Sequence, residues 1–420
     1  MKSVDDFYKE DEMLKLIAQL LSVVVIAALV VAIWPGAALE DSGAVAATAV
    51  PIVAPSSPAT QLRPAQSAAG DGFGQAIAVD GVTAVIGAPQ ASDGRGAVTV
   101  FSLQNGRWQE TAHLTASDGA PGHTFGQSVA ISGQTILVGA SGHNAAYLFE
   151  QANGRWQQTA KLLPGSAQDF HFGRSVALAG DTAVVGAPYR YIQGEMVSTG
   201  SVAVFTRQGE SWPQQTRLTS GQSGGRVGSD LFGWAVAAQG NIIAVGAHLQ
   251  DKVYLYESAN GQWRETAVLP GDRGGQFGYS LALAPQALLV GAPATDAQAT
   301  RGGTAVLFMR QTGGNWAETA RFAPEGLRPG SRFGWSVALS GDVAVSGMRE
   351  SEGQRDVEES GGTFAFRIAN GRTAQSVALY APNPAPFEHM GTAVAASTDA
   401  IFAGAPGPES APGTVYIFKD

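Results

Sequence analysis

A short phrase that returns seven times constrains the fold of this chain more than any other feature. Each copy opens with a Phe-Gly pair, passes through an alternating apolar run to a tight turn, and reaches a Gly-Ala element. The copies begin at Phe73, Phe125, Phe172, Phe232, Phe277, Phe333 and, in a weakened form, Met390. Their starts are 45 to 60 residues apart. A period of about 40–60 residues with several strands per unit is typical of propellers and repeat arrays.

The copy that begins at Phe125 shows how one unit folds. Residues 125–131 alternate as a first strand, and residues 135–139 form an apolar second strand. A third strand over 146–149 leads to Asn153-Gly154, a pair that favours a two-residue hairpin turn because both positions accept positive φ. Trp156 opens a fourth strand. Four short strands joined by turns predict one antiparallel blade.

Burial can be predicted strand by strand. The second strands are continuous apolar runs, such as Ala183-Val184-Val185, and a strand that is apolar on both sides is buried on both faces. Radial stacking of blades provides such burial. The fourth strands are more polar, as in residues 109–114, which suits an outer edge where charge discourages pairing with other chains.

These seven phrases resemble the FG-GAP repeat, the unit of integrin-α-like β-propellers and of many bacterial surface proteins. The resemblance covers residues 59–420 and implies an all-β, seven-bladed propeller. Integrin-like members often carry an Asp-rich calcium loop between the first two strands. Here each corresponding turn holds at most one carboxylate, and calcium needs several oxygens that converge. No metal site and no cofactor is therefore expected.

Closure of the ring can also be predicted. The last copy reaches its third strand at residues 414–418 and lacks a fourth. Upstream of the first copy, residues 60–64 repeat the fourth-strand pattern of residues 159–164. We therefore expect residues 59–66 to complete the last blade, so that removal of residues 1–58 leaves a folded domain and removal of residues 1–70 does not.

The N-terminal region contains an uncharged apolar run of 19 residues from Leu16 to Trp34. This length spans a hydrocarbon core as a helix. We predict one transmembrane helix over residues 13–34, with residues 1–12 as a cytoplasmic tail, because Lys2, Lys9 and Lys15 precede its apolar run. A cleaved signal peptide is the alternative reading, since small residues follow the run at 36–38. Both readings place the propeller outside the cytoplasm, in the periplasm or at the cell surface.

Composition narrows the remaining possibilities. Residues 35–58 are rich in Ala and Pro and predict an extended tether between the helix and the propeller at 59–420. The net charge is −9 without a basic patch, so nucleic acid is not an expected partner. The absence of Cys excludes disulfides and Cys-ligated metals.

The residue after each Phe-Gly pair supplies a first group of candidate binding residues. Three successive copies place an aromatic residue there, Trp234, Tyr279 and Trp335, and the copy before them places Arg174. We expect the aromatic residues to form an arc near the mouth of the central channel, where they could bind a sugar or a peptide. Packing between blades is the alternative.

The loops between strands two and three supply a second group. In propellers these loops share a face with the connections between blades, and their lengths differ strongly here. The third copy contributes Tyr189, Arg190 and Tyr191, and the sixth contributes Arg349 and Arg355. The uneven face predicts a partner footprint at the long loops, with neutral variation of loop length as the alternative.

Other residues are expected to be structural. A tryptophan opens the fourth strand in five copies, which indicates a packing role. His123, His171 and His389 fall in blade-connecting loops and are expected to be independent surface residues rather than ligands of a shared metal ion. No Gly-x-Ser-x-Gly, His-Glu-x-x-His or phosphate-binding Gly-Lys-Ser/Thr motif is present, so no catalytic residue is assigned.

These patterns favour a single-pass membrane protein that binds or scaffolds other proteins, including integral subunits of a membrane complex. Cell-surface adhesion through glycans is an alternative. An extracytoplasmic hydrolase or lyase on a propeller scaffold is the alternative from another class.

Overall fold

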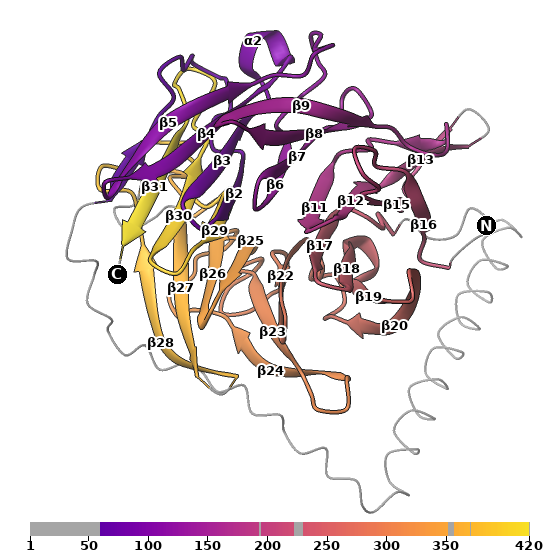
Figure 1. Ribbon diagram of the computed structural model, residues 1–420. Helices are drawn as coiled ribbons and strands as arrows, with labels where there is room; N and C mark the ends of the chain where they lie inside the picture. Colours follow the sequence, from indigo (N-terminus) through magenta and orange to yellow (C-terminus); the bar gives the residue numbers. More distant parts are fainter. Residues whose placement is uncertain (1–58, 193–194, 222–229, 352–356, 370, 420) are drawn as a thin grey trace, which may run out of the picture. The chain divides into compact units, whose positions relative to one another are not determined.

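Each copy of the repeated phrase forms one four-stranded antiparallel sheet in the computed structural model of this chain (Figure 1). The structure describes residues 59–192, 195–221, 230–351, 357–369 and 371–419. Within these residues the strands form seven four-stranded sheets and one three-stranded sheet. The prediction of an all-β, seven-bladed propeller is confirmed.

The first four blades follow one another along the chain, and each is built from four strands in sequence order. They are β2 (Ala76–Asp80), β3 (Thr83–Ala88), β4 (Ala97–Gln104) and β5 (Arg107–Leu114); β6 (Ser128–Ser132), β7 (Thr135–Ala140), β8 (Ala145–Ala152) and β9 (Arg155–Leu162); β11 (Ser175–Ala179), β12 (Thr182–Ala187), β15 (Ser201–Thr206) and β16 (Gln214–Leu218); β17 (Ala235–Gln239), β18 (Ile242–Ala247), β19 (Lys252–Ala259) and β20 (Gln262–Pro270).

The last three blades complete the ring. They are β21 (Ser280–Ala284), β22 (Ala287–Ala292), β23 (Thr304–Arg310) and β24 (Trp316–Phe322); β25 (Phe333–Ser340), β26 (Val343–Met348), β27 (Gly362–Ala369) and β28 (Arg372–Leu379); β29 (Ala393–Ala396), β30 (Ala400–Ala405), β31 (Thr414–Lys419) and β1 (Thr60–Leu62). The three-stranded sheet joins β10 (Asp169–Phe170), β13 (Tyr189–Ile192) and β14 (Glu195–Val197), and two helical turns, α2 (Ala91–Gly94) and η1 (His248–Gln250), lie in loops.

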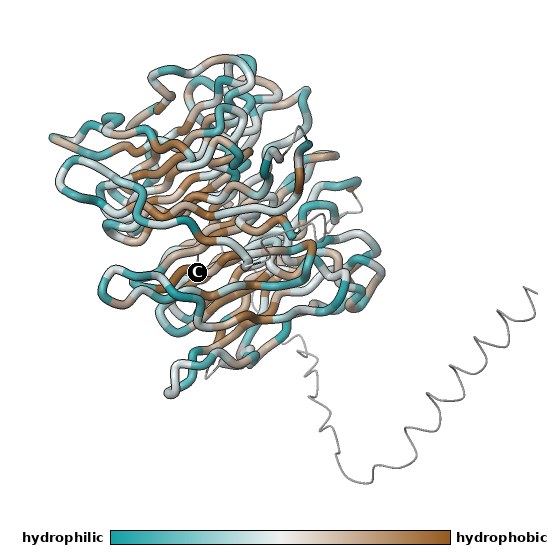
Figure 2. The backbone as a smooth tube through the Cα atoms, turned by 90° about the vertical axis from the view of Figure 1, so that its right-hand side faces the viewer, coloured by the Kyte–Doolittle hydropathy of each residue, from teal (hydrophilic) through white to brown (hydrophobic). Residues whose placement is uncertain are grey.

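The first strand of each blade lies nearest the propeller axis. These strands contact one another in an unbroken circle, from β2 through β6, β11, β17, β21, β25 and β29 back to β2. The fourth strands lie at the rim, and their side chains alternate between exposed and half-buried, as in β9. Second strands such as β7 are buried at every position. Figure 2 shows the same contrast between apolar inner strands and polar loops.

Strand β1 closes the ring. It pairs antiparallel with β31, with Thr60 opposite Ile417 and Leu62 opposite Val415. The Leu62 side chain is only 4% exposed. Nε of Arg63 donates a hydrogen bond to Oγ1 of Thr414 at 3.0 Å. The predicted closure by the segment that begins at residue 59 is confirmed.

The repeated phrase forms the seam between neighbouring blades. The glycine of each Gly-Ala element faces the Phe-Gly glycine of the next blade so closely that a Cβ on Gly87 would lie 1.9 Å from the carbonyl oxygen of Gly126. The contact between blades seven and one is equivalent, because a Cβ on Gly404 would lie 2.1 Å from the carbonyl oxygen of Gly74. Glycine is therefore required at the seam for steric reasons.

Serines tighten four of these seams. The residue two positions after Phe-Gly donates its hydroxyl hydrogen to the Phe-Gly glycine carbonyl of the following blade, as from Ser128 to Gly173 at 2.9 Å. The other three serines are Ser175, Ser280 and Ser336. The Phe side chain of the pair is buried between blades, and Phe125 is 0% exposed among Val98, Val138 and Tyr147.

The backbone N–H of the Phe or Met that opens each phrase donates its hydrogen bond to one of two kinds of acceptor. In three blades it donates to a backbone carbonyl of the preceding blade, as Phe125 does to Arg95. In the other four it donates to a side-chain oxygen, which comes from Asp71, Asn144, Asp230 or Asp251. The buried carboxylates of Asp71 and Asp230 thus replace a backbone partner.

Six of the seven first strands begin three residues after the start of the phrase, and only β25 begins at its Phe. The alternation predicts a strand from Phe125, whereas β6 begins at Ser128. Gly126 has φ 90°, a left-handed conformation that interrupts the extended backbone directly after Phe125.

Among the described residues, no helix is both long enough and apolar enough to cross a bilayer. The predicted helix at 13–34 and the tether at 35–58 lie outside those residues.

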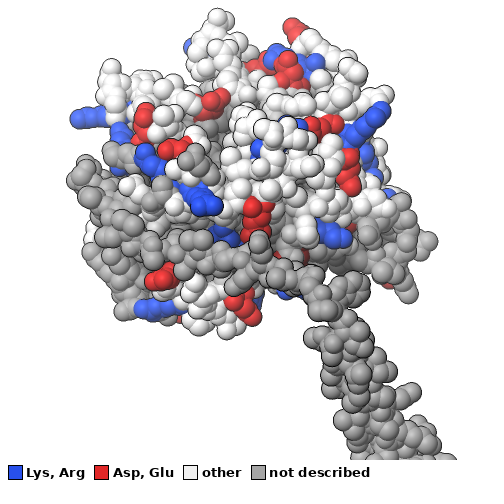
Figure 3. All heavy atoms as spheres, turned by 90° about the horizontal axis from the view of Figure 1, so that it is seen from below, with Lys and Arg blue, Asp and Glu red and all other residues white. Residues whose placement is uncertain are grey.

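Basic and acidic side chains are interspersed over the described surface drawn in Figure 3.

Candidate functional site

Two positions of the repeat meet at one end of the inner strands. The residue after Phe-Gly directly precedes the first strand in six blades and lies near the start of β25 in the other. The residue after Gly-Ala directly follows the second strand, with which the first pairs antiparallel. In blades three to six the first of these positions carries an aromatic or cationic side chain, and in blades four and six the second does so too. Together with Arg332, which precedes Phe333, we call them the arginine–aromatic cluster: Arg174, Trp234, His248, Tyr279, Arg332, Trp335 and Arg349.

The aromatic rings of the cluster are in contact across three blades. The ring centroids of Trp234 and Tyr279 are 5.5 Å apart, and those of Tyr279 and Trp335 are 4.8 Å apart. The His248 ring packs 4.7 Å from Trp234 and 5.3 Å from Tyr279. The aromatic residues predicted to form an arc are therefore in contact with one another, and they pack between three neighbouring blades.

Arginines flank both ends of this aromatic row. Cζ of Arg174 lies 4.0 Å from the ring centroid of Trp234. At the other end, Cζ of Arg349 lies 5.1 Å and Cζ of Arg332 lies 5.6 Å from the ring centroid of Trp335. Such cation–π contacts contribute about 0.5–2 kcal/mol each, most where water is excluded.

One carboxylate belongs to this group. Glu350 lies 2.6 Å from Nε of Arg332 and 3.7 Å from a terminal nitrogen of Arg349. Burial raises the pKa of Tyr279, whereas the charges of Arg174, Arg349 and Arg332 act to lower it and that of Glu350 acts to raise it. Three cations and one carboxylate therefore act on a single tyrosine hydroxyl, and the cluster is electropositive.

Burial differs within the cluster. His248 is 4% exposed, and its Nδ1 atom has no hydrogen-bond partner among the described residues. Burial lowers the pKa of His248 to about 4, and the nearby charge of Arg174 acts in the same direction, so this imidazole is neutral at physiological pH. The arginines, Trp234, Tyr279 and Trp335 keep part of their surface in solvent. The exposed parts of these side chains can therefore contact a ligand, while the buried His248 ring packs against Trp234 and Tyr279.

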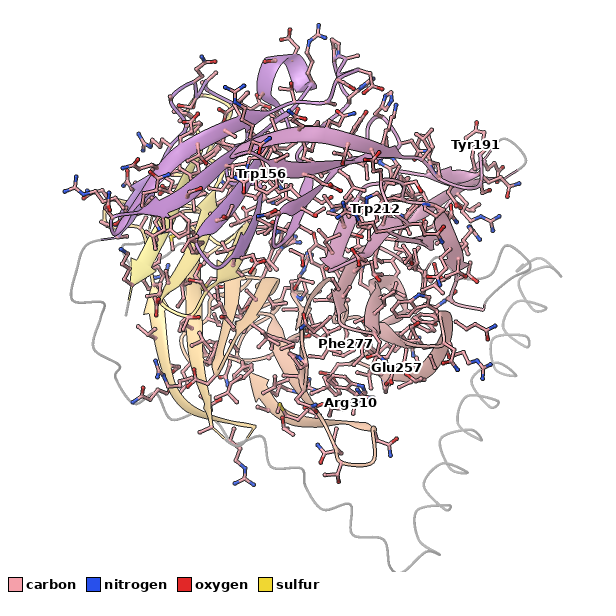
Figure 4. All side chains as sticks on the ribbon, viewed as in Figure 1. Trp156, Tyr191, Trp212, Glu257, Phe277 and Arg310 are labelled. Atoms are coloured by element: carbon pink, nitrogen blue, oxygen red, sulfur yellow. The ribbon has the colours of Figure 1, made fainter. Side chains whose placement is uncertain are left out.

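The blade-three loop lies beside Arg174 but makes a separate set of contacts. Tyr189 stacks near His171, with ring centroids 5.3 Å apart. Arg190 donates a hydrogen bond to Oε1 of Gln168 at 2.6 Å and lies 3.9 Å from Asp169. Tyr191 is 52% exposed and stands at the outer tip of β13 in Figure 4.

Asp169 anchors that loop. Its carboxylate is 3% exposed and accepts two hydrogen bonds from the guanidinium of Arg217, at 2.9 and 2.5 Å. A similar ion pair joins the third strands of blades four and five, where Arg310 of β23 donates to both oxygens of Glu257 of β19 at 2.8 Å (Figure 4). In blade six Arg349 belongs to the arginine–aromatic cluster, whereas Arg355 lies outside the described residues.

The expectation of independent surface histidines is wrong for His123, which contacts a second histidine. Nδ1 of His143 lies 3.0 Å from Nε2 of His123, and Nζ of Lys161 lies 2.6 Å from both His143 and Asp118. Hydrogen bonds from Lys161 and then Tyr147 hold the pKa of Asp118 at about 2. This network joins the blade-two loop to the connection that precedes the blade.

The repeated tryptophans pack where the sequence predicts. Trp108, Trp156, Trp212, Trp263 and Trp316 each join a different hydrophobic cluster between blades. In the part of the chain that the structure describes, no three His, Asp or Glu side chains are placed to hold a metal ion.

Sequence reasoning missed His248 and Arg332 and assigned Arg349 to a variable loop. The available signal was the position after Gly-Ala, which is Pro in four copies but His248 in the fourth and Arg349 in the sixth. This position departs from the repeat on two of the blades that carry an aromatic residue after Phe-Gly, and the departure identifies His248 and Arg349 but not Arg332.

Comparison with known proteins agrees with this architecture. A family model described as the FG-GAP repeat matches residues 59–101, 108–149, 156–205, 212–262 and 316–366, which is more than half of the chain. No curated protein sequence matches. Among solved structures, U3-55K is similar at 15% identity over 88% of this chain and 100% of its own, with a TM-score of 0.56. Virginiamycin B lyase from Staphylococcus aureus is similar at 9% identity over 86% of this chain and 99% of its own, with a TM-score of 0.55. At these identities the likeness is one of fold.

Proposed function

This chain belongs to the FG-GAP repeat family, and from that premise we propose that it is a membrane-anchored, non-catalytic module. Its propeller binds or scaffolds protein partners outside the cytoplasmic membrane, among them integral subunits of a membrane complex. The uncharged run from Leu16 to Trp34 supports the anchor, because its length matches a bilayer and lysines precede it.

The arginine–aromatic cluster is the observation that carries the binding role. Tryptophan, tyrosine and arginine are the residue types that contribute most to protein interfaces. Here they are gathered at one end of four adjacent blades, and Trp234, Tyr279 and Trp335 are rigid and partly open to solvent. A rigid scaffold that presents such side chains loses little conformational entropy on binding.

Capture from detergent-solubilised membranes tests this role. The full chain is used as bait, beside Trp335→Ala and a matched surface control, Val82→Ser. Val82 is 59% exposed in the turn between β2 and β3, at the opposite end of the strands. A stoichiometric partner recovered with the wild type and with Val82→Ser, but not with Trp335→Ala, is the expected result. Absence of any partner in the wild-type eluate, or equal recovery with Trp335→Ala, would contradict the assignment.

A glycan-binding role at the cell surface is the second candidate. The half-exposed rings of Trp234, Tyr279 and Trp335 favour it, since aromatic faces also stack on sugars. Binding of the full chain to a glycan array, lost in Trp335→Ala, together with no protein partner, would establish adhesion in place of scaffolding. Turnover of a substrate that depends on these residues would instead establish an enzyme.

A further inference from the structure

Arg174 differs from the other half-buried arginines that the structure describes around the ring. Arg190, Arg207, Arg217, Arg310, Arg321, Arg332 and Arg349 each lie within 4.0 Å of a carboxylate. Arg174 has a contact with the face of Trp234, but no carboxylate and no side-chain hydrogen bond among the described residues. A guanidinium carries five N–H donors, and removing it from water without an acceptor is unfavourable.

The surroundings of Arg174 increase that cost. Trp234 covers one side, and burial lowers the pKa of the guanidinium below its ordinary value. Burial, and after it the charge of Arg174, lower the pKa of His171 and of His248. The contact with the indole face leaves the N–H groups available, so an incoming group can still accept hydrogen bonds from them.

The opposite end of the cluster shows which group satisfies an arginine here. Arg332 and Arg349 lie against Trp335 and share the carboxylate of Glu350. Arg174 lies against Trp234 in the corresponding way, but the described structure supplies no second glutamate. The two ends of one aromatic row therefore differ by one carboxylate.

We propose that Arg174 is a receptor for a carboxylate side chain of a bound polypeptide, which takes the place beside Trp234 that Glu350 takes beside Trp335. This inference rests on the protein-binding role proposed above and names the chemistry that the partner must present: an Asp or Glu flanked by apolar residues.

Apolar side chains beside Arg174 favour a polypeptide over a free anion or a polyanion. Phe170 is 41% exposed, lies opposite Tyr189 in the small sheet of β10 and β13, and precedes Arg174 by four residues. The His171 ring links Phe170 to Tyr189, with centroids 4.8 and 5.3 Å away. An isolated cation beside an apolar surface suits one acidic residue within an apolar segment, whereas a polyanion is bound by several adjacent cations.

Fluorescence anisotropy with a matched pair of peptides tests the inference. The probe is a capped, dye-labelled peptide of four Leu-Glu repeats, and its counterpart has four Leu-Gln repeats. Both are titrated with the full chain in non-ionic detergent at physiological salt. We expect the glutamate peptide to bind at least tenfold more tightly than the glutamine peptide. In Arg174→Gln this preference should fall below twofold, whereas Arg372→Gln, an exposed arginine on β28, should retain it.

Stability provides a second readout. If Arg174 is kept for a ligand, Arg174→Gln should lower the Tm of the free protein by no more than about 2 °C, the effect of losing the contact with Trp234, and loss of the preference then cannot result from unfolding. A Tm lowered by several degrees would show a structural role and overturn the inference. Equal binding of the two peptides, no binding of either, or binding of polygalacturonate in place of the glutamate peptide would also overturn it.

The two proposals can fail separately. A partner captured equally by the wild type and by Arg174→Gln, but lost in Trp335→Ala, would leave the protein-binding role intact and refute the carboxylate receptor. Loss of capture in both variants would support both proposals.

Discussion

Closure of the propeller by β1 makes a quantitative prediction about Leu62. This side chain is 4% exposed and lies opposite Val415. Leu162 occupies the same place in the second blade, where it is 3% exposed and lies opposite Ala146. The two leucines differ only in how they are joined to their blade, because a hairpin connects β9 to β8 whereas almost the whole sequence of the domain separates β1 from β31.

Substitution of either leucine by alanine removes three buried carbon atoms. Each buried methylene contributes about 0.8 kcal/mol, and the cavity left behind adds to the loss, so we expect about 3 kcal/mol for Leu62→Ala and for Leu162→Ala alike. Gln61→Ala is the control, since Gln61 is exposed on the same strand, and it should change stability by about 0.5 kcal/mol or less.

Urea unfolding of the full chain in detergent provides the measurement. Tryptophan fluorescence suits it because Trp108 of blade one packs edge-on against Phe402 of blade seven, with ring centroids 5.3 Å apart across the closing seam. The reasoning would be refuted if Leu162→Ala lowered the free energy of unfolding by about 3 kcal/mol while Leu62→Ala, like Gln61→Ala, changed it by about 0.5 kcal/mol or less. Strand β1 would then not complete the last blade. Truncation at residue 58 should likewise be tolerated, and truncation at residue 70 should not.

Three further predictions concern buried groups. The pKa of His248 is lowered from 6.5 to about 4, so the folded state resists protonation and loses stability as pH falls below 6.5. Between pH 7 and pH 5 the free energy of unfolding should fall by about 2 kcal/mol through this group. In His248→Met the fall between the two pH values, measured by urea unfolding, should be smaller by that amount. Gly87→Ala should lower stability by about 3 kcal/mol because its Cβ would meet the carbonyl of Gly126, whereas Gly313→Ala, which has open space, should not; equal Tm values for the two variants would argue against the seam. Arg217→Gln should cost about 3 kcal/mol by leaving the buried carboxylate of Asp169 without its principal partner, and a Tm within one degree of the wild type would contradict that account.

The sequence predicts the blades well because the repeat encodes contacts that every blade must make. The Phe side chain fills the space between blades, and the glycines permit the carbonyl contact at each seam. A strict steric requirement that is repeated seven times is visible in one sequence. The closing strand is visible for the same reason, since residues 60–64 follow the pattern of every other fourth strand.

The candidate site is less predictable because it depends on departures from the repeat. The arc of Trp234, Tyr279 and Trp335 can be read from one aligned position. That Arg349 reaches Trp335, and that Arg174 has no described carboxylate beside it, depends on side-chain directions in loops that the repeat does not constrain. The same holds for the contact between His123 and His143, which brings together two loops 20 residues apart.

The short pairing of β1 with β31 also determines how the domain carries mechanical load. A pull along the chain that precedes residue 59 is borne first by three residue pairs, from Thr60 to Leu62, and by the Arg63–Thr414 hydrogen bond. These bonds complete the last blade, whereas contacts of β2 with β29 and β30 also join blades seven and one. If residues 35–58 tether the propeller to a membrane and a partner binds the opposite end of the molecule, tension between the two detaches β1 before it disrupts the other strands. Strand β1 is thus the first element to detach under load, while the inner strands of blades seven and one stay in contact.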